Sequence, residues 1–148
     1  MTAPAEDYEL DDRLARVDLD TVWSFLSTAA YWARWRTRED VAQQVRGAWR
    51  VVGAYRREDG SMVGFARAIS DGVALGYLAD VFVLPDHRGR GLGRRLVSTM
   101  IDAGPGSGFR WLLHTADAHE LYSQLGFGSP DTTLMERPAA RPAVSALD

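Results

Sequence analysis

Arginines and glycines alternate in one short turn, which reads RGRGLGRR from Arg88 to Arg95. An apolar run ending at Leu84 precedes the turn and an amphipathic stretch follows it, a pattern typical of a strand, a loop and a helix. Backbone N–H groups at a helix start bind phosphate, and glycines let a phosphate approach the backbone. Cations are unfavourable in a first helical turn, so these arginines indicate a bound polyanion. A solvated basic turn is the alternative.

Two common phosphate-binding motifs do not fit this turn. A dinucleotide-binding loop needs G-x-G-x-x-G, but the last position falls on Arg94 or Leu96, depending on which glycine begins the pattern. A P-loop needs Gly-Lys-Ser/Thr, and the chain contains no lysine. The pattern that fits is R-x-x-G-x-G, from Arg88 to Gly93.

This pattern resembles the acetyl-coenzyme A (acetyl-CoA) pyrophosphate loop of the GCN5-related N-acetyltransferase (GNAT) family. Farther along, the segment LYSQLGF from Leu121 to Phe127 is similar to the family's L-Y-x-x-x-G-F segment. Two motifs in the right order are more specific than either alone. The resemblance extends from roughly Met62 to Phe127.

The resemblance implies that acetyl-CoA is bound by the turn and the strand before it. The implied cofactor-binding residues are Val81, Phe82, Val83, Arg88, Gly89, Arg90, Gly91, Leu92, Gly93 and Arg94. The resemblance also implies direct attack of an amine on the thioester, with no acyl-enzyme, and the chain has no cysteine to form one. It places the pantetheine arm between splayed strands near the segment 114–116.

Tyr122 is the candidate general acid. An ordinary phenol has a pKa near 10 and keeps its proton at neutral pH, so it can protonate a departing thiolate. The resemblance gives the tyrosine at this motif position that role. Tyr122 also lies on the apolar face of its predicted helix, so a core position with a satisfied hydroxyl is the alternative, and both readings can hold.

Asp80 is the first candidate for a second catalytic group. A carboxylate between Ala79 and Val81 in a buried strand is costly unless it has a partner or a function. We expect Asp80 to orient a proton-carrying water or to receive a cationic acceptor; a structural hydrogen bond to a loop is the alternative. His114 and His119 can also titrate near neutral pH, although a structural role is favoured for each.

Three aromatic residues, Tyr31, Trp32 and Trp35, stand close together beside arginines. We expect them to line the acceptor site and to contact a cation through their ring faces. The competing interpretation is that Trp32 and Trp35, three residues apart, pack one helix face into the core.

The elements that position these residues follow from hydrophobic periodicity and turn signals. Helices are expected to begin at Asp18 or Asp20, at Thr37, near Leu92 and at Asp117, with capping boxes at Thr37 and Asp117. Strands are expected at 8–10, 49–56, 62–69, 73–84, 109–113 and 132–137. A helix joins 73–84 to 109–113, so these two strands should be parallel. The result is an α/β fold with a mixed, mostly antiparallel sheet flanked by helices, compatible with the GNAT acyl-CoA N-acyltransferase fold.

Length and composition narrow the classes of protein. The 148 residues suit one domain, which we place at 1–137, followed by a Pro- and Ala-rich tail at 138–148 that is expected to be disordered. A net charge of −3 argues against general nucleic-acid binding, and three scattered histidines without cysteine argue against a metal centre. No apolar run is long enough for a membrane, and the N-terminus does not resemble a signal peptide, so a cytoplasmic protein is expected.

The sequence therefore predicts an acetyl-CoA-dependent N-acetyltransferase that moves the acetyl group directly to an amine, on a small molecule or a peptide. A catalytically weak sensor that binds CoA or acetyl-CoA is the alternative, and a nucleotide-binding regulator would instead prefer ATP or NAD. A homodimer, common in the resembling family, is a further expectation. The sequence does not identify the acceptor or the base.

Overall fold

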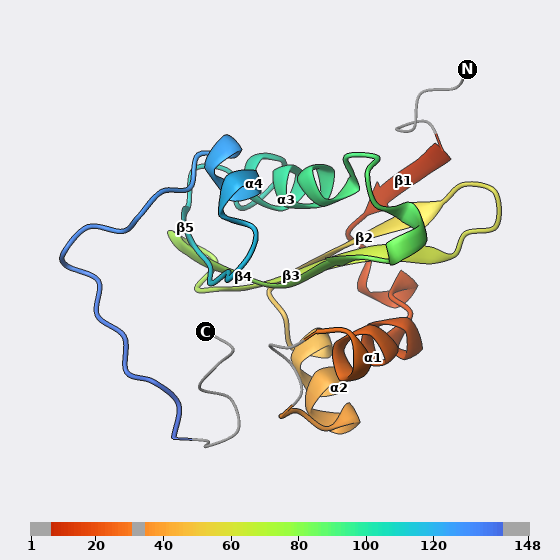
Figure 1. The fold of residues 1–148 in the computed structure, drawn as a ribbon, viewed down its shortest axis with the longest axis horizontal. Helices are drawn as coiled ribbons and strands as arrows, with labels where there is room; N and C mark the ends of the chain where they lie inside the picture. The colour runs from red at the N-terminus through yellow and green to blue at the C-terminus, as the bar shows by residue number, and fades with distance from the viewer. Residues whose placement is uncertain (1–6, 31–34, 141–148) are drawn as a thin grey trace.

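A five-stranded sheet with helices on both faces forms the body of the protein (Figure 1). The computed structural model describes residues 7–30 and 35–140. The strands lie side by side in chain order: β1 (Tyr8–Asp11), β2 (Arg50–Arg56), β3 (Met62–Ser70), β4 (Leu75–Val83) and β5 (Arg110–Leu112). Strands β1 to β4 are antiparallel, whereas β5 is parallel to β4, as the sequence predicts.

The helices divide into two pairs, one on each face of the sheet (Figure 1). The helices α1 (Leu19–Thr28) and α2 (Arg38–Arg46) cover one face; α3 (Leu92–Asp102) and α4 (His119–Gln124) cover the other. Asp18 caps α1 by accepting from two backbone N–H groups, and the predicted capping box of Thr37 and Asp40 begins α2. Within the described residues, no helix combines the length and apolar character needed to cross a membrane.

Two apolar clusters hold these helices to the sheet. On the α3 side, Leu96, Val97 and Met100 are fully buried against side chains of β2 and β3. On the α1–α2 side, Leu26 and Val45 are buried together with residues of the same strands. Burying one such side chain contributes about 1.5–3 kcal/mol, so both helix layers are fixed by the central strands.

Two sequence predictions near the C-terminus are wrong. Residues 132–137 form no strand; Leu134 and Met135 are exposed, so pairing there would bury no apolar face. Helix α4 has Ala118 rather than Asp117 as its N-cap and no side-chain cap, and the Ala118 N–H donates to Thr115 Oγ1. Of the predicted disordered tail, 138–140 is exposed without regular structure and 141–148 lies outside the described residues.

A β-bulge interrupts the pairing of β3 with β4. Arg67 pairs with Ala79 and Phe65 with Phe82, so Asp80 and Val81 together oppose a single residue of β3. Asp80 has a φ of 55°, a left-handed conformation that is uncommon outside glycine. The extra residue reverses which face of the sheet the following side chains occupy. Leu78 therefore packs on the α3 side, while Phe82 packs on the α1–α2 side.

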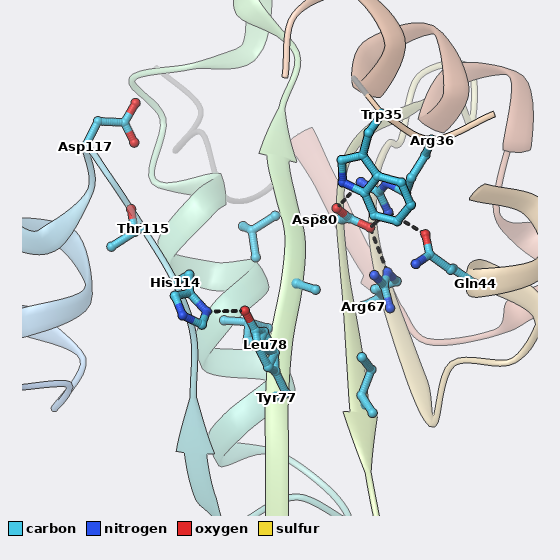
Figure 2. A pocket seen from close by; sticks show the side chains of 13 residues that line it. Trp35, Arg36, Gln44, Arg67, Tyr77, Leu78, Asp80, His114, Thr115 and Asp117 are labelled. Carbon is cyan, nitrogen blue, oxygen red and sulfur yellow. Dashed lines mark hydrogen bonds and ion pairs between the residues drawn. The ribbon is translucent and has the colours of Figure 1, made fainter. Parts of the chain in front are cut away.

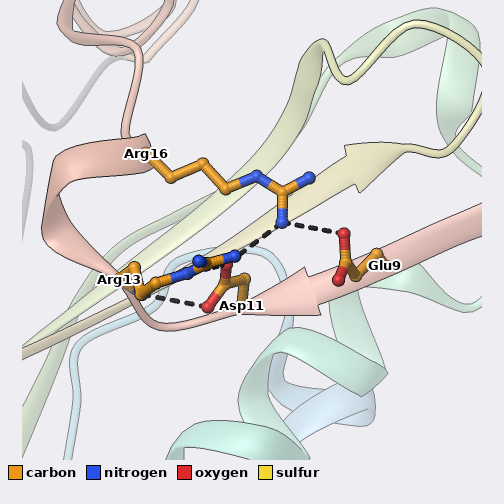
Figure 3. A network of polar contacts seen from close by, with 4 residues as sticks. All are labelled: Glu9, Asp11, Arg13 and Arg16. Atoms are coloured by element: carbon orange, nitrogen blue, oxygen red, sulfur yellow. Dashed lines mark hydrogen bonds and ion pairs between the residues drawn. The ribbon is translucent and has the colours of Figure 1, made fainter.

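A separate network of charges fixes the N-terminal edge strand (Figure 3). Arg16, in a short 3₁₀ turn, donates to Glu9 at 2.8 Å and to Asp11 at 3.0 Å. The Arg13 Nε donates to the same carboxylate oxygen of Asp11 at 2.7 Å, and the Arg16 guanidinium lies 3.9 Å from the Tyr55 ring centre. These contacts tie the chain entering α1 to β1 and β2.

Candidate active site

The predicted phosphate loop lies at the start of α3. Gly89 and Gly91 have φ values of 77° and 78°, and a Cβ atom at either would meet nothing within 4 Å. Glycine is therefore needed for the left-handed backbone, and the space beside the loop is open. Gly91 is the N-cap of α3 without a side-chain cap, so no side chain shields the first N–H groups of the helix.

The arginines of the loop differ in their surroundings. The Arg88 Nε donates to the Val83 carbonyl oxygen at 2.9 Å, which folds that side chain back over the end of β4. The Arg94 guanidinium donates to Gln124 Oε1 at 2.6 Å and so connects α3 to α4. Arg90 is exposed. The loop thus keeps its positive charge between the end of β4 and α4.

The last part of β4, before the loop, has one edge that no neighbouring strand covers in the described chain. Pairing with β5 ends where Tyr77 meets Leu112, but β4 continues to Val83. Of the predicted cofactor-binding residues there, Phe82 has a buried side chain stacked on Phe25 at 4.2 Å, and Leu92 is equally buried. Contacts of those two residues with a ligand would therefore be made by the backbone.

A pocket of about 330 Å³ opens beside this edge (Figure 2). Its walls come from the segment before α2, from β3 and β4, and from the segment after β5. The lining residues are Trp35, Arg36, Gln44, Arg67, Ile69, Tyr77, Leu78, Ala79, Asp80, Val81, His114, Thr115 and Asp117. Of the predicted aromatic wall, Trp35 lines this pocket, while Tyr31 and Trp32 lie outside the described residues.

Asp80 is held in this pocket by two arginines (Figure 2). Arg36 donates to both carboxylate oxygens at 2.9 and 2.8 Å, and the Arg67 Nε donates at 2.7 Å. Burial alone would raise the pKa of Asp80, but the hydrogen bond from Arg36 and the charges of Arg67 and Arg36 outweigh it and lower that pKa. Asp80 is therefore ionised and engaged, which weighs against its predicted role as a base.

Tyr122 is a buried residue of α4, with its ring edge-on to Phe127. Burial, together with the negative charge of Asp117, raises the pKa of Tyr122 to about 12. The hydroxyl therefore holds its proton more firmly than an ordinary phenol. Asp117 also lines the pocket, so the charge that raises the pKa of Tyr122 lies at one end of that pocket.

A chain of three polar groups lies along the same wall. Tyr77 Oη is 2.5 Å from His114 Nδ1, and His114 Nε2 is 2.8 Å from a carboxylate oxygen of Glu136. Tyr77 and His114 both line the pocket. The other candidate histidine, His119, begins α4, is exposed and does not line the pocket.

Sequence reasoning missed Arg36, Arg67, Tyr77 and Glu136. Arg67 had a detectable signal, since it is a charged residue inside the apolar strand 62–69, as Asp80 is in the next strand. Arg36 reaches Asp80 across 44 positions of sequence, and Glu136 reaches His114 from a segment without regular structure. Spacing along the chain does not reveal such contacts.

Comparison with known proteins identifies the family. The sequence pattern of the acetyltransferase (GNAT) family matches residues 18–127. A solved GNAT-family protein from Xanthomonas campestris pv. campestris is 34% identical, over 89% of this chain and 93% of that one, with a TM-score of 0.82. The chain belongs to the GNAT family of acetyltransferases. Its mixed sheet with flanking helices is the GNAT fold, as the sequence predicts.

Two further relatives of this GNAT chain are informative. A Gibberella zeae protein named as an acetyltransferase is 33% identical over 107 residues, which cover 71% of this chain but 58% of that protein. The matched segment is thus little more than half of that relative. A Mycobacterium tuberculosis protein solved in complex with CoA is 17% identical, over 83% of this chain and 73% of that one, with a TM-score of 0.66. At that identity it shows the shared fold alone.

Proposed function

We propose that this GNAT chain transfers the acetyl group of acetyl-CoA to an amine acceptor. The observation that carries the proposal is the loop from Arg88 to Gly93, with its left-handed glycines and uncapped helix start. Unpaired N–H groups at such a helix start bind phosphate. The CoA complex of the M. tuberculosis relative, which has the same fold, supports this ligand.

The residues present fit acetyl-CoA. The loop would hold the pyrophosphate, because the space beside both glycines is open. The uncovered edge of β4, including the backbone of Val81, Phe82 and Val83, would bind the pantetheine arm. When bound there, acetyl-CoA supplies an activated thioester. The chain's own residues then position the amine and move protons.

Tyr122 is the proposed proton donor to the departing sulfur. An ordinary thiol has a pKa near 8.5, well below the value of about 12 for Tyr122. The hydroxyl is therefore protonated wherever the thiolate forms. Tyr122 is also buried in the core, which supports a packing role, and one residue can have both roles.

His114 is the proposed acceptor of the amine proton, acting through Tyr77. If His114 Nε2–H donates to Glu136, then Nδ1 accepts from the Tyr77 hydroxyl, at the observed 2.8 and 2.5 Å. Tyr77 can then pass its proton to Nδ1 while its oxygen takes the proton from the amine. The carboxylate of Glu136 would stabilise the resulting imidazolium. Asp80 lacks this freedom because guanidinium groups engage both of its oxygens.

The deciding experiment measures free thiol released from acetyl-CoA across a broad panel of amines, with the acetylated product identified by mass. We expect release to be stimulated by particular amines. If CoA binds but no amine raises release above the acceptor-free rate, the chain is a CoA-binding sensor and the proposal fails. No described feature favours that sensor reading at present, since loop, pocket and proton donors are all retained.

A further inference from the structure

The pocket wall formed by the segment before α2 and by β3 and β4 carries an excess of positive charge. Two guanidinium groups, Arg36 and Arg67, surround the single carboxylate of Asp80, so this cluster has a net charge of +1. All three side chains are at least nine-tenths buried. A buried excess charge is costly unless an anion compensates it.

The two arginines also have unused donors. The Nε of Arg67 donates to Asp80, and no hydrogen bond from its two terminal nitrogens to another described residue is found, although Arg67 lines the pocket. The Nε of Arg36 is likewise buried without a hydrogen-bond partner in the described chain. Buried polar groups are nearly always satisfied, so the Arg36 Nε indicates a missing partner, and the terminal nitrogens of Arg67 are donors that a ligand in the pocket can use. A carboxylate matches the fork of a guanidinium well.

The opposite end of the pocket is different in charge. Asp117, Thr115 and His114 line it, across the pocket from the arginine cluster (Figure 2). Asp117 directly precedes Ala118, the N-cap of the helix that carries Tyr122, so this is the end nearer to the proposed proton donor. The pocket is therefore polarised, with negative and proton-accepting groups at one end and free guanidinium donors at the other.

We propose that the acceptor is an amine that also carries an acidic group, as an amino acid does, and that Arg67 binds this acidic group. The amine would then lie toward His114 and Asp117. This inference rests on the proposed acetyl transfer and names its substrate class. It replaces the expectation that Asp80 itself receives a cationic acceptor, because Asp80 is already compensated by arginine.

A second cavity gives room for acceptors larger than the smallest amino acids. A space of about 420 Å³ continues from the first, and Arg67, Gln44 and Ile69 line both. Arg67 thus stands at the junction of the two. The body of the acceptor can pass this residue toward Trp49 and Ser70, so the acidic group need not mark the end of the molecule.

The test uses matched acceptors with the parent protein. Each α-amino acid is compared with its amide and with the amine that lacks the carboxyl group, by thiol release at fixed acetyl-CoA. Loss of a charge-assisted hydrogen bond should lower kcat/KM by about 10- to 100-fold, mostly through KM. An amino sugar phosphate serves as a second arm, which distinguishes a phosphate from a carboxylate. Equal kcat/KM for acid, amide and amine would overturn the inference while leaving acetyl transfer intact.

A variant assigns the effect to one residue. Arg67→Gln should abolish the preference for the acid over its amide. Arg16→Gln, which also removes an arginine engaged with carboxylates but outside the pocket, should keep the preference. If Arg67→Gln does not fold, the acid-to-amide comparison in the parent protein decides alone.

A binding measurement separates the two proposals. With CoA present, N-acetylated amino acids should raise the melting temperature and their amides should not. That result, without turnover of any amine, would retain the acidic-group site and reject acetyl transfer. Turnover of amines with equal binding of acids and amides would reject the acidic-group site.

Discussion

The phosphate loop can be tested with two glycines that share a backbone conformation. Gly91, in the loop, has a φ of 78°; Gly60, in the hairpin between β2 and β3, has a φ of 75°. A Cβ atom at either position would meet nothing within 4 Å. Valine at either site is therefore strained by the backbone and not by crowding, at a cost of about 1–3 kcal/mol. Only at Gly91 would the side chain also occupy the space proposed for phosphate.

The size of the effect follows from mass action. At 100 times its Kd, CoA should stabilise the parent protein by about 2.7 kcal/mol. At about 2–4 °C per kcal/mol for a domain of this size, the melting temperature should rise by about 5–11 °C. If Gly91→Val weakens CoA binding by about 10-fold, about 1.4 kcal/mol remains at the same concentration, and after about 100-fold weakening only about 0.4 kcal/mol remains.

The assay compares thermal unfolding of the parent protein, Gly91→Val and Gly60→Val, each with and without CoA. Both variants should melt lower than the parent without ligand, by similar amounts. The CoA-dependent shift should be full in Gly60→Val and reduced to half or less in Gly91→Val. A full shift in a folded Gly91→Val variant would refute phosphate binding at the loop.

The remaining predictions concern individual side chains. Tyr122→Phe should lower kcat by about 10²-fold with CoA affinity unchanged; an unchanged kcat, with chemistry rate-limiting, would make Tyr122 a core residue only. Because the pKa of Tyr122 is about 12, its titration should not limit kcat below about pH 11. His114→Gln should lower kcat by about 10²-fold, and an unchanged kcat would exclude this base. Asp80→Asn should raise KM while leaving the pH profile of kcat intact; a changed profile would restore Asp80 as the base.

The ion pairs of Asp80 should also make the stability of the fold depend on pH in the acid range. Its folded-state pKa is lowered, so its ionisation contributes stability above the ordinary aspartate value near 3.9, and this contribution is lost as pH falls through the folded value. At neutral pH, Asp80→Asn should destabilise the fold by about 3–5 kcal/mol, because it leaves buried arginines uncompensated. Denaturant unfolding should show this difference shrinking below about pH 4. A constant difference from pH 7 to pH 3 would contradict the assignment.

The sequence predicted correctly the elements that form within one continuous segment of the chain. The strand, glycine loop and helix around Arg88 to Gly93 follow from periodicity and glycine placement within one segment, and the structure has all three. Antiparallel hairpins and the parallel fifth strand follow from short turns and a helical connection. The pocket beside β4 is different, since its walls come from segments far apart in sequence. Contacts such as that between Arg36 and Asp80 depend on how the helix layer is set on the sheet.

The bulge in β4 explains why the contact between Arg67 and Asp80, on neighbouring strands, could not be predicted from the sequence. The hairpin register pairs Arg67 with Ala79 and Ala68 with Leu78, so a regular ladder would place Asp80 opposite Ala66. Ala66 and Leu78 both belong to the apolar cluster under α3, and an unbulged Asp80 would enter that cluster without a partner. One extra residue, with Asp80 at a φ of 55°, turns the carboxylate to the face where Arg67 and Arg36 lie. Backbone strain of about 1–3 kcal/mol is smaller than the cost of burying an unpaired carboxylate, so the charge pairing decides the local backbone.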